Sequence, residues 1–415
     1  MITMRLKYIL ILIFMWSSFA FSQENETKLD FTGFVDTYHA VRSKSPYDFM
    51  SSRTRFRGEL KMLKGNSYFF TSFNAMYNSI LKSQTGIELR EAFFEYSTSS
   101  WDLKAGRQIV IWGVADGMRI TDIISPMDMT EFLARDYDDI RIPVNAIRLR
   151  LLRPKMRFEL VYVPVPSFFI IPDEAENPWA VFPKDGNPVF DINMDNKPNL
   201  ELDNSEVGAR FSFFLPGADF SVCALHTWNK MPVFSRSYSS NDDTVFVKAH
   251  YYRLNMIGFD FSIPKGEFVF RGEAAYYIGE ARELDDEIIN TEPIKKNSLN
   301  WLLGIDWYPG NDWTITVQYS HKFITNYIDI LQEKENIVLS TAGITKKLFR
   351  STLSVSTFTY VDISNGGFFD RSSIDYALSD EIHLLIGYDW FYGNKGMFGL
   401  YKDNSEYWFK AKYSF

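Results

Sequence analysis

Cysteine is almost absent from this chain of 415 residues, because Cys223 is the single one. One cysteine excludes an intramolecular disulfide. Small exported proteins commonly rely on disulfides for stability, so if this chain is exported, something else must hold its fold.

Long hydrophobic runs are also missing once the first 22 residues are passed. Residues 1–22 have the parts of a secretory signal peptide: Arg5 and Lys7 at a basic start, an apolar run from Tyr8 to Trp16, and small residues before Gln23. The apolar run is shorter than the roughly 20 residues of a transmembrane helix. We therefore expect cleavage before Gln23, which leaves residues 23–415 as the mature protein.

Basic residues are fewer than acidic ones: the chain has 44 Lys and Arg against 52 Asp and Glu, which gives a net charge of −8. This balance argues against a nucleic-acid partner, which requires a basic face.

Side-chain patterns typical of catalysis and of cofactor binding are missing too. The five histidines (His39, His226, His250, His321 and His383) stand in none of the Ser or Asp contexts of barrel phospholipases or proteases. No Cys and His set fits zinc, and no Gly-rich phosphate loop is present. Asp136, Asp138 and Asp139 cluster, but they lack the Gly and the distal Glu of a calcium loop. We predict no enzyme activity, no cofactor and no metal.

Aromatic residues are abundant, at 17% of the chain, although the mean hydropathy is slightly negative. Aromatics interleaved with polar residues suit a transmembrane β-barrel, with an apolar wall, aromatic girdles and a polar lumen. An array of soluble β-sandwiches has a similar composition, so composition alone leaves both open.

Alternation of polar and apolar residues favours the barrel. In Arg53 to Met62, RTRFRGELKM, every charged side chain falls on one face of a strand, whereas on a helix the charges would scatter. The same pattern recurs at residues 206–213, 257–262, 268–274, 301–307 and 313–320. Short turns alternate with longer connections such as Pro164 to Asn204, as in outer-membrane barrels. We expect an all-β, transmembrane, antiparallel up-and-down barrel of about 18 strands (16–18), with residues 164–204 as a long extracellular loop.

The C-terminus supplies separate support for export to an outer membrane. Apolar side chains alternate from Tyr407 to Phe415, and the chain ends on Phe. A terminal Phe of this kind resembles the signal that the barrel assembly machinery recognises. We expect that machinery, through Phe415, and outer-membrane lipid as partners.

Charged side chains on the expected inner faces are the candidates for lumen and selectivity sites. They are Arg53, Arg55, Arg57, Glu59, Glu91, Glu95, Arg107, Arg148, Arg150, Arg157, Arg271 and Glu273. Paired, they would hold the barrel in shape; unpaired, they would select solutes by charge. Both roles stay open. The facing of Glu91, Glu95 and Arg107 is ambiguous, and a β-bulge at Gly106 would re-aim half of that strand.

One stretch, residues 114–142, interrupts the strand pattern between the fifth and sixth strands. Ser125-Pro126-Met127-Asp128 has the residues of a helix start, and Met129, Phe132 and Leu133 follow at helical spacing. Pro143 ends the stretch. Its acids are Asp116, Asp122, Asp128, Glu131, Asp136, Asp138 and Asp139. The pattern predicts an inserted constriction loop that carries a short helix.

Residues 86–165 contain REAFFEYS, LKAGRQIVIWG and ISPMD. These segments resemble the REA, GRQ…WG and NP-x-D signatures of poorly characterised Gram-negative outer-membrane barrels, some of which accompany lipid-exporting systems. Ser125 replaces the usual Asn. General diffusion porins are more distant in sequence but also fold the loop after strand five into the lumen, with its acids facing a basic ladder. The resemblance implies a porin-like barrel in the cell outer membrane.

Together these patterns predict an outer-membrane channel for small or elongated solutes, narrowed by residues 114–142. The alternative is a surface receptor or structural barrel that binds a partner through its long loops, above all residues 164–204.

Overall fold

The computed structural model describes residues 27–137, 139–174, 176–181, 189–238, 244–285, 288 and 290–415. The expected signal peptide, its cleavage site and Asp138 lie outside these ranges. In the part of the chain so described, no helix is long and apolar enough to cross a membrane.

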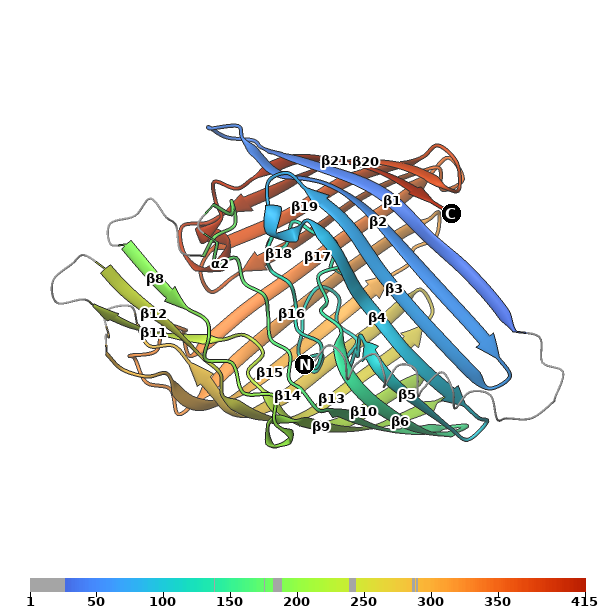
Figure 1. Ribbon diagram of the computed structural model, residues 1–415, viewed down its shortest axis with the longest axis horizontal. Coiled ribbons are helices and arrows are strands. Elements are labelled where there is room, and N and C mark those ends of the chain that lie inside the picture. The colour runs from blue at the N-terminus through green and yellow to red at the C-terminus, as the bar shows by residue number, and fades with distance from the viewer. Residues whose placement is uncertain are drawn as a thin grey trace, which may run out of the picture.

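Eighteen antiparallel strands form one sheet, and the sheet closes because β1 pairs with β21 (Figure 1). The strands are β1 (Lys28–Arg42), β2 (Phe49–Lys64), β3 (Ser67–Asn78), β4 (Gly86–Ser97), β5 (Trp101–Gln108), β6 (Val144–Arg153), β7 (Met156–Val163), β9 (Glu206–Leu215), β10 (Ala218–Trp228), β13 (Arg253–Lys265), β14 (Phe268–Arg282), β15 (Ile294–Trp307), β16 (Trp313–Thr325), β17 (Asn336–Leu348), β18 (Leu353–Asp362), β19 (Gly367–Ala377), β20 (Ile382–Tyr392) and β21 (Glu406–Ser414). The predicted barrel and its count of eighteen are confirmed.

The alternation seen in the sequence becomes the inner and outer faces of this wall. On β2, Arg53, Arg55 and Arg57 are buried inside the barrel, whereas Thr54 between them is exposed. On β13, Ile257 is 59% exposed while its inward neighbour Asp260 is 3% exposed. Apolar side chains that stay exposed in a closed sheet form the surface that lipid would cover.

A second sheet lies at the end of the barrel that carries the long connections, which we call the loop end (Figure 1). It contains β8 (Val189–Asn193), β11 (Val233–Tyr238) and β12 (Thr244–His250); β12 pairs antiparallel with β11 and parallel with β8. Three short helices complete the described elements: η1 (Lys82–Gln84), η2 (Leu202–Asn204) and α2 (Gly396–Leu400). The opposite end, with the short connections, is called the turn end.

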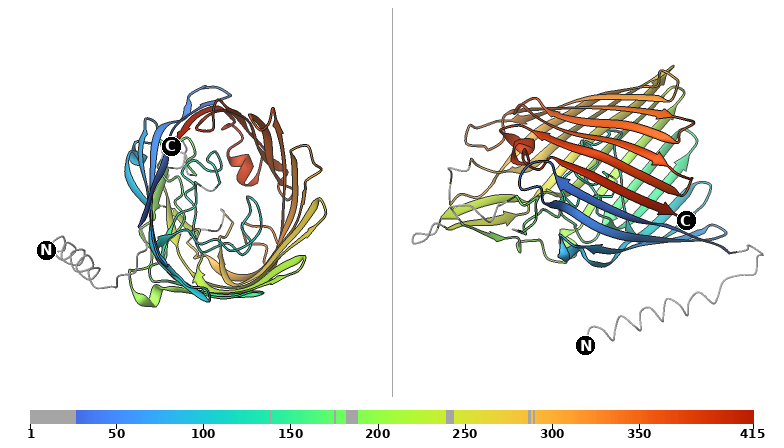
Figure 2. Two further views of the ribbon diagram at one scale, coloured as in Figure 1. Left: turned by 90° about the vertical axis from the view of Figure 1, so that its right-hand side faces the viewer. Right: turned by 90° about the horizontal axis from the view of Figure 1, so that it is seen from above.

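The stretch between β5 and β6 lies inside the barrel. Figure 2 (left), turned to look along the strands, shows this teal to green trace within the ring of strands. It runs from Ile109 to Pro143, longer than the expected residues 114–142, because β5 ends at Gln108. We call Ile109–Pro143 the insertion.

The prediction of a short helix within the insertion is wrong, since no helix forms in the described residues of the insertion. Met127 and Asp128 instead make β-bridges to Arg141 and Ile170, which hold the chain extended where the helix would begin. The Asp128 side chain then accepts bonds from the main-chain N–H and hydroxyl of Thr130, which stabilises a turn. The long-range pairing and this local turn are therefore favoured over the helix that the spacing of Met129, Phe132 and Leu133 predicts.

The expected β-bulge lies one strand earlier than Gly106. The β4–β5 ladder continues without a shift through Gly106, whereas the β3–β4 register shifts so that Ser72 pairs with Glu91 and Phe73 with Leu89. Arg90 is the extra residue. The bulge lets both Arg90 and Glu91 reach groups inside the barrel, because it reverses the alternation between them.

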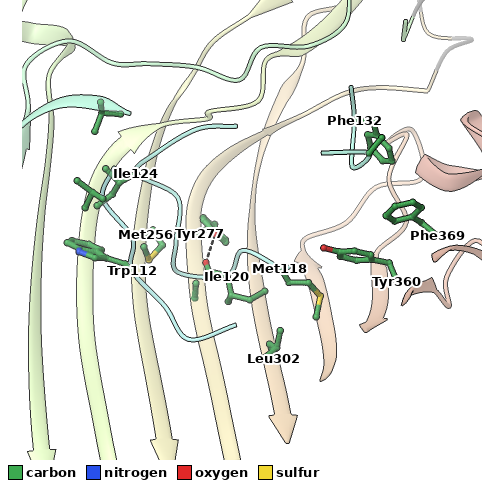
Figure 3. Packing of buried hydrophobic residues seen from close by; sticks show 14 of the residues in the cluster. Trp112, Met118, Ile120, Ile124, Phe132, Met256, Tyr277, Leu302, Tyr360 and Phe369 are labelled. Atoms are coloured by element: carbon green, nitrogen blue, oxygen red, sulfur yellow. Dashed lines mark hydrogen bonds between the residues drawn. The ribbon is translucent and has the colours of Figure 1, made fainter. Parts of the chain in front are cut away.

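The main hydrophobic core is the contact between the insertion and the wall. Figure 3 shows Met118 and Ile120 of the insertion next to Tyr277, Leu302 and Tyr360 of the wall. Trp112, Ile124, Phe132, Met256 and Phe369 belong to the same buried cluster. The insertion therefore packs against the inner face of the wall through apolar side chains.

Candidate functional site

The insertion is held by charged and polar groups from several sides of the barrel, and β2 provides the first side. Arg53 pairs with Glu131. Arg55 and Arg57 both bind Asp139, each with an N–O distance of 2.9 Å, and Arg55 also binds Asp36 of β1 at 2.6 Å. The predicted basic ladder therefore meets predicted acids of the insertion directly.

Asp139 is the centre of this first side. Burial acts to raise the pKa of its carboxyl, but Arg55 and Arg57 outweigh burial and hold that pKa well below its usual value. Arg90, which the bulge brings inward, adds a hydrogen bond of 3.1 Å to the main-chain oxygen of Asp139. The carboxylate thus remains charged while it is largely removed from water.

Glu273 of β14 provides a second side with a different chemistry. Its carboxylate accepts bonds from the main-chain N–H groups of Val114, Ala115 and Thr121, and from the Thr121 hydroxyl at 2.9 Å. Gly113 permits the approach, because a Cβ there would lie 2.7 Å from a Glu273 oxygen and its φ is +107°. One carboxylate therefore holds the main chain of the insertion at three residues.

Arg271, two residues before Glu273, binds Asp116 of the insertion and Asp306 of β15. It also donates to the Val114 main-chain oxygen at 2.6 Å. Gln318 of β16 holds the main chain of Asp116 with two further bonds. The predicted pair Arg271 and Glu273 thus act together on one turn of the insertion.

The last strands extend the first side, because β21 pairs with β1, the strand next to β2. Lys410 of β21 binds Asp136 at 2.7 Å, and Arg371 of β19 donates to the Ala134 oxygen at 2.9 Å. Asp136 and Asp139 therefore bind different cations, Lys410 on one strand and the β2 arginines on another. Their carboxylates anchor the insertion rather than converge on one point.

The two remaining predicted acids that the structure describes are paired within the insertion. Asp122 binds Arg141 and accepts the main-chain N–H of Trp112 at 3.0 Å. Asp128 binds Arg135 at 2.7 Å. Ser125 also acts within the insertion, because its hydroxyl accepts a hydrogen bond from the main-chain N–H of Val110 at 3.0 Å.

Most of the other predicted residues lie near the insertion or toward the turn end. Glu91 accepts the N–H of Ile109. Glu59 lies 3.7 Å from Lys61, Arg150 binds Asp102 and approaches Glu95, and Arg157 lies over the Phe214 ring. Glu159 of β7 also reaches the insertion and accepts the indole N–H of Trp112. Nε of Arg148 is buried without a hydrogen-bond partner among the described residues. Arg107 donates to the main-chain oxygens of Leu89 and Arg90 at the bulge.

Several anchoring residues were missed by the sequence-based reasoning. The hydroxyls of Tyr38, Tyr277 and Tyr360 donate to main-chain oxygens of Ala134, Ile120 and Gly117, respectively, and Gln318, Arg371 and Lys410 were also missed. Each of these residues occupies an inward-facing position in the alternation of its strand, and that alternation can be read from the sequence. Nothing in the local sequence distinguishes an inward-facing tyrosine from an interfacial one, so these three tyrosines could not be singled out.

Comparisons with known proteins can now be set beside this geometry. Residues 81–379 match the model of the family described as "Protein of unknown function (DUF1302)". No curated protein sequence matches the chain.

Solved structures resemble the chain over nearly its whole length. Pseudomonas aeruginosa OccK3 (OpdO) has a TM-score of 0.53 at 10% identity, over 94% of this chain and 96% of that chain. OccK11 (OpdR) of the same organism has a TM-score of 0.51 at 9% identity, over 93% and 95%. The outer membrane channel DcaP of Acinetobacter baumannii has a TM-score of 0.47 at 10% identity, over 95% and 99%. The likeness to the two Pseudomonas proteins shows a shared barrel fold.

Proposed function

The chain belongs to the DUF1302 family, and from the way its insertion occupies the barrel we propose that it is an outer-membrane channel for small or elongated solutes. In this proposal Ile109–Pro143 narrows the lumen and sets what passes. The mature protein resides in the outer membrane of a Gram-negative bacterium, and the solute crosses beside the insertion.

One observation carries the proposal: the insertion is bound to opposed parts of the wall at once. Asp139 binds β2, the turn at Val114 binds β14, and Asp136 binds β21. β2 and β21 both border β1, whereas β14 lies across the barrel from them, so the insertion is held from two opposite sides and stays across the lumen rather than folding out of it. Barrels of 16 to 18 strands otherwise leave a wide aqueous channel, so a fixed obstruction determines the free cross-section.

The pairing also favours one of the two roles considered for the lumen charges. Arg53, Arg55 and Arg57 are each engaged by a carboxylate, so the ladder anchors the insertion more than it faces solutes. The charges nearer the turn end, among them Arg148 and Arg157, are better candidates for selecting solutes.

Planar-bilayer recording of the purified barrel tests the proposal. Gln108 and Val144 are direct partners in the β5–β6 ladder, so replacing residues 109–143 by Asn-Gly joins the strands as a hairpin without moving the wall. We expect small conductance steps for the wild-type protein and several-fold larger steps for this deletion variant. Absence of conductance from both proteins, each shown to be folded, would refute the channel. Equal conductance would refute only the narrowing.

The three-stranded sheet at the loop end favours a second candidate, a receptor whose outer surface binds a partner. Tyr238 and Phe246, on β11 and β12, are 52% and 43% exposed. The part of the long connection that precedes this sheet contacts the barrel interior instead. Trp179 is fully buried, and Ile170 exchanges main-chain hydrogen bonds with Met127 and Met129. Substituting Tyr238 and Phe246 by Ser therefore tests partner binding without disturbing the insertion. Loss of cell or ligand binding with unchanged conductance would favour the receptor.

A further inference from the structure

A cavity of about 440 Å³ lies between the insertion and the wall. The wall side of its lining comes from the parts of β10 and β13 to β18 nearest the loop end, including Trp228, Leu254, Tyr277 and Leu339. Small-molecule sites have volumes of roughly 300–1,000 Å³. The cavity therefore has the size of a solute site and lies where a solute entering from the loop end would meet the insertion.

The lining is unusually apolar for the lumen of an outer-membrane barrel. Five methionines contribute, three from the insertion and two from outside it: Met118, Met127, Met129, Met231 and Met397. Isoleucine, leucine and aromatic side chains fill most of the remainder. Porin lumens are lined by polar groups, whereas flexible, polarisable methionines are typical of surfaces that adapt to varied apolar ligands.

Three Arg and Lys side chains line the cavity, and two of them are bound to carboxylates. Lys230 binds Glu206, and Lys322 binds Glu333 at 3.0 Å. Arg119 differs, because its Nε and Nη2 donate to the main-chain oxygens of Asp122 and Ser125. Its Nη1 is buried with no hydrogen-bond partner among the described residues. A guanidinium is thus left with one free donor group at the edge of an apolar cavity.

Other polar atoms around the same cavity also lack partners in the described part of the chain. They are Oδ1 of Asn229, Oδ1 of Asn300 and the hydroxyl of Tyr137. Asn229 and Asn300 are each only 9% exposed. Buried polar groups are almost always hydrogen-bonded, so a ligand with a polar group would find partners among these atoms.

We infer that this cavity binds an amphipathic monocarboxylate, with its carboxylate on Nη1 of Arg119 and its apolar body among the methionines. A guanidinium recognises a carboxylate through strong, charge-assisted hydrogen bonds. The inference rests on the proposed channel and deepens it, since it assigns the class of solute that meets the constriction.

Equilibrium dialysis of the full mature barrel in amphipol tests this inference, with radiolabelled dodecanoate and dodecan-1-ol as probes. The two share a chain, and only dodecanoate carries the charge. Arg119→Gln removes the cation, and Leu339→Trp fills the cavity from β17, which does not depend on how the insertion folds. Arg350→Gln makes the same change as Arg119→Gln on an exposed turn and is the matched control. Heat-dependent gel mobility verifies that each variant is folded.

We expect the wild-type barrel to bind dodecanoate more tightly than dodecan-1-ol. Arg119→Gln should weaken dodecanoate binding about tenfold or more, the effect of losing one charged hydrogen bond, and leave dodecan-1-ol unchanged. Leu339→Trp should weaken both probes, and Arg350→Gln neither. Absence of saturable binding to the wild type, or unchanged binding by folded Leu339→Trp, overturns the site. Unchanged dodecanoate binding by Arg119→Gln overturns its carboxylate part.

Conductance of the same preparations separates this inference from the proposed function. A barrel that conducts but binds neither probe contradicts the solute class and leaves the channel standing. A barrel that binds dodecanoate at Arg119 but never conducts supports the site and contradicts the channel.

Discussion

At the scale of single residues, the insertion depends on a few carboxylates that each serve several donors. Glu273 accepts three main-chain N–H groups and one hydroxyl, and Asp139 accepts from Arg55 and Arg57. Removing such an acid leaves several buried donors without that acceptor, which costs more than the bonds themselves. Single substitutions at these positions should therefore loosen a long stretch of chain.

Asp139→Asn should destabilise the placement of the insertion by about 3 kcal/mol, since it leaves two buried guanidinium groups without their shared anion. We expect larger current fluctuations in planar bilayers and a lower unfolding temperature. Asp195→Asn neutralises an exposed loop acid and should change neither. Identical current noise in the Asp139 and Asp195 variants would contradict the anchoring role.

The same carboxylate gives a pH dependence. A carboxyl with a lowered pKa in the folded protein contributes stability above its unfolded pKa, and that contribution is lost as pH falls through the folded value. An ordinary Asp is half protonated at about pH 4. The pKa of Asp139 lies well below that, as burial is outweighed by Arg55 and Arg57. Single-channel noise should stay constant from pH 7 to about pH 4 and rise only in more acidic solution. A rise centred at the ordinary Asp pKa would argue against this pairing.

Gly113→Ala should displace the turn that Glu273 holds. Its Cβ would meet a Glu273 oxygen at 2.7 Å, and alanine is strained at a φ of +107° by about 1–3 kcal/mol. Gly217→Ala is the matched control, because Gly217 also has a positive φ but nothing lies within 4 Å of its added Cβ. Gly113→Ala should enlarge the conductance and Gly217→Ala should not. Similar behaviour of the two would show that the Glu273 contact is unimportant.

At the scale of elements, the strands and the position of the insertion could be predicted, but the conformation of the insertion could not. Alternation is a local property with a period of two, so strands such as β2 and β16 lie where the sequence indicated. The turn at Met129 to Phe132 depends instead on bridges to Arg141 and Ile170, and Asp136 depends on Lys410. Neighbouring residues carry no information about such partners, which explains why a helix was expected there.

The last strand offers a prediction at this scale. Phe415 exchanges two main-chain bonds with Gly33, and its ring lies 5.9 Å from Phe31 and 6.0 Å from Phe56. Phe415→Ala should cost about 1 kcal/mol of barrel stability, since the ring is only partly buried. If the assembly machinery reads this residue, the amount of folded barrel in outer-membrane fractions should fall several-fold, far beyond that cost.

Phe349→Ala is the control for the C-terminal substitution, because Phe349 is a turn residue that is 77% exposed. It should leave the yield of folded barrel unchanged, as judged by heat-dependent gel mobility. Equal yields for the two variants would remove Phe415 as an assembly signal.

At the scale of the whole molecule, acidic side chains of the insertion pair with basic side chains of the barrel wall. Glu131 and Asp139 of the insertion bind a ladder of three arginines on β2, and Asp36 of β1 is the third carboxylate bound to it. Replacing residues 109–143 by Asn-Gly should expose that ladder to the emptied lumen. The variant should become anion-selective, as a pore lined by arginines is.

The reversal potential in a salt gradient measures this change of selectivity. The deletion variant should shift toward the anion potential relative to the wild type. Combining the deletion with Arg53→Gln, Arg55→Gln and Arg57→Gln should abolish the shift. A shift that persists in the combined variant would assign the selectivity to other cations.

The bond between Asp136 and Lys410 joins residues 274 positions apart, and it has a consequence for the order of events during biogenesis. Asp136 can bind Lys410 only after β21 has joined the wall. Until β21 pairs with β1, the carboxylate of Asp136 lacks this partner, although β2 and β14 can already hold the insertion. A barrel that has not yet closed would therefore hold the insertion by fewer contacts, and the pore would reach its final width only when β21 pairs with β1.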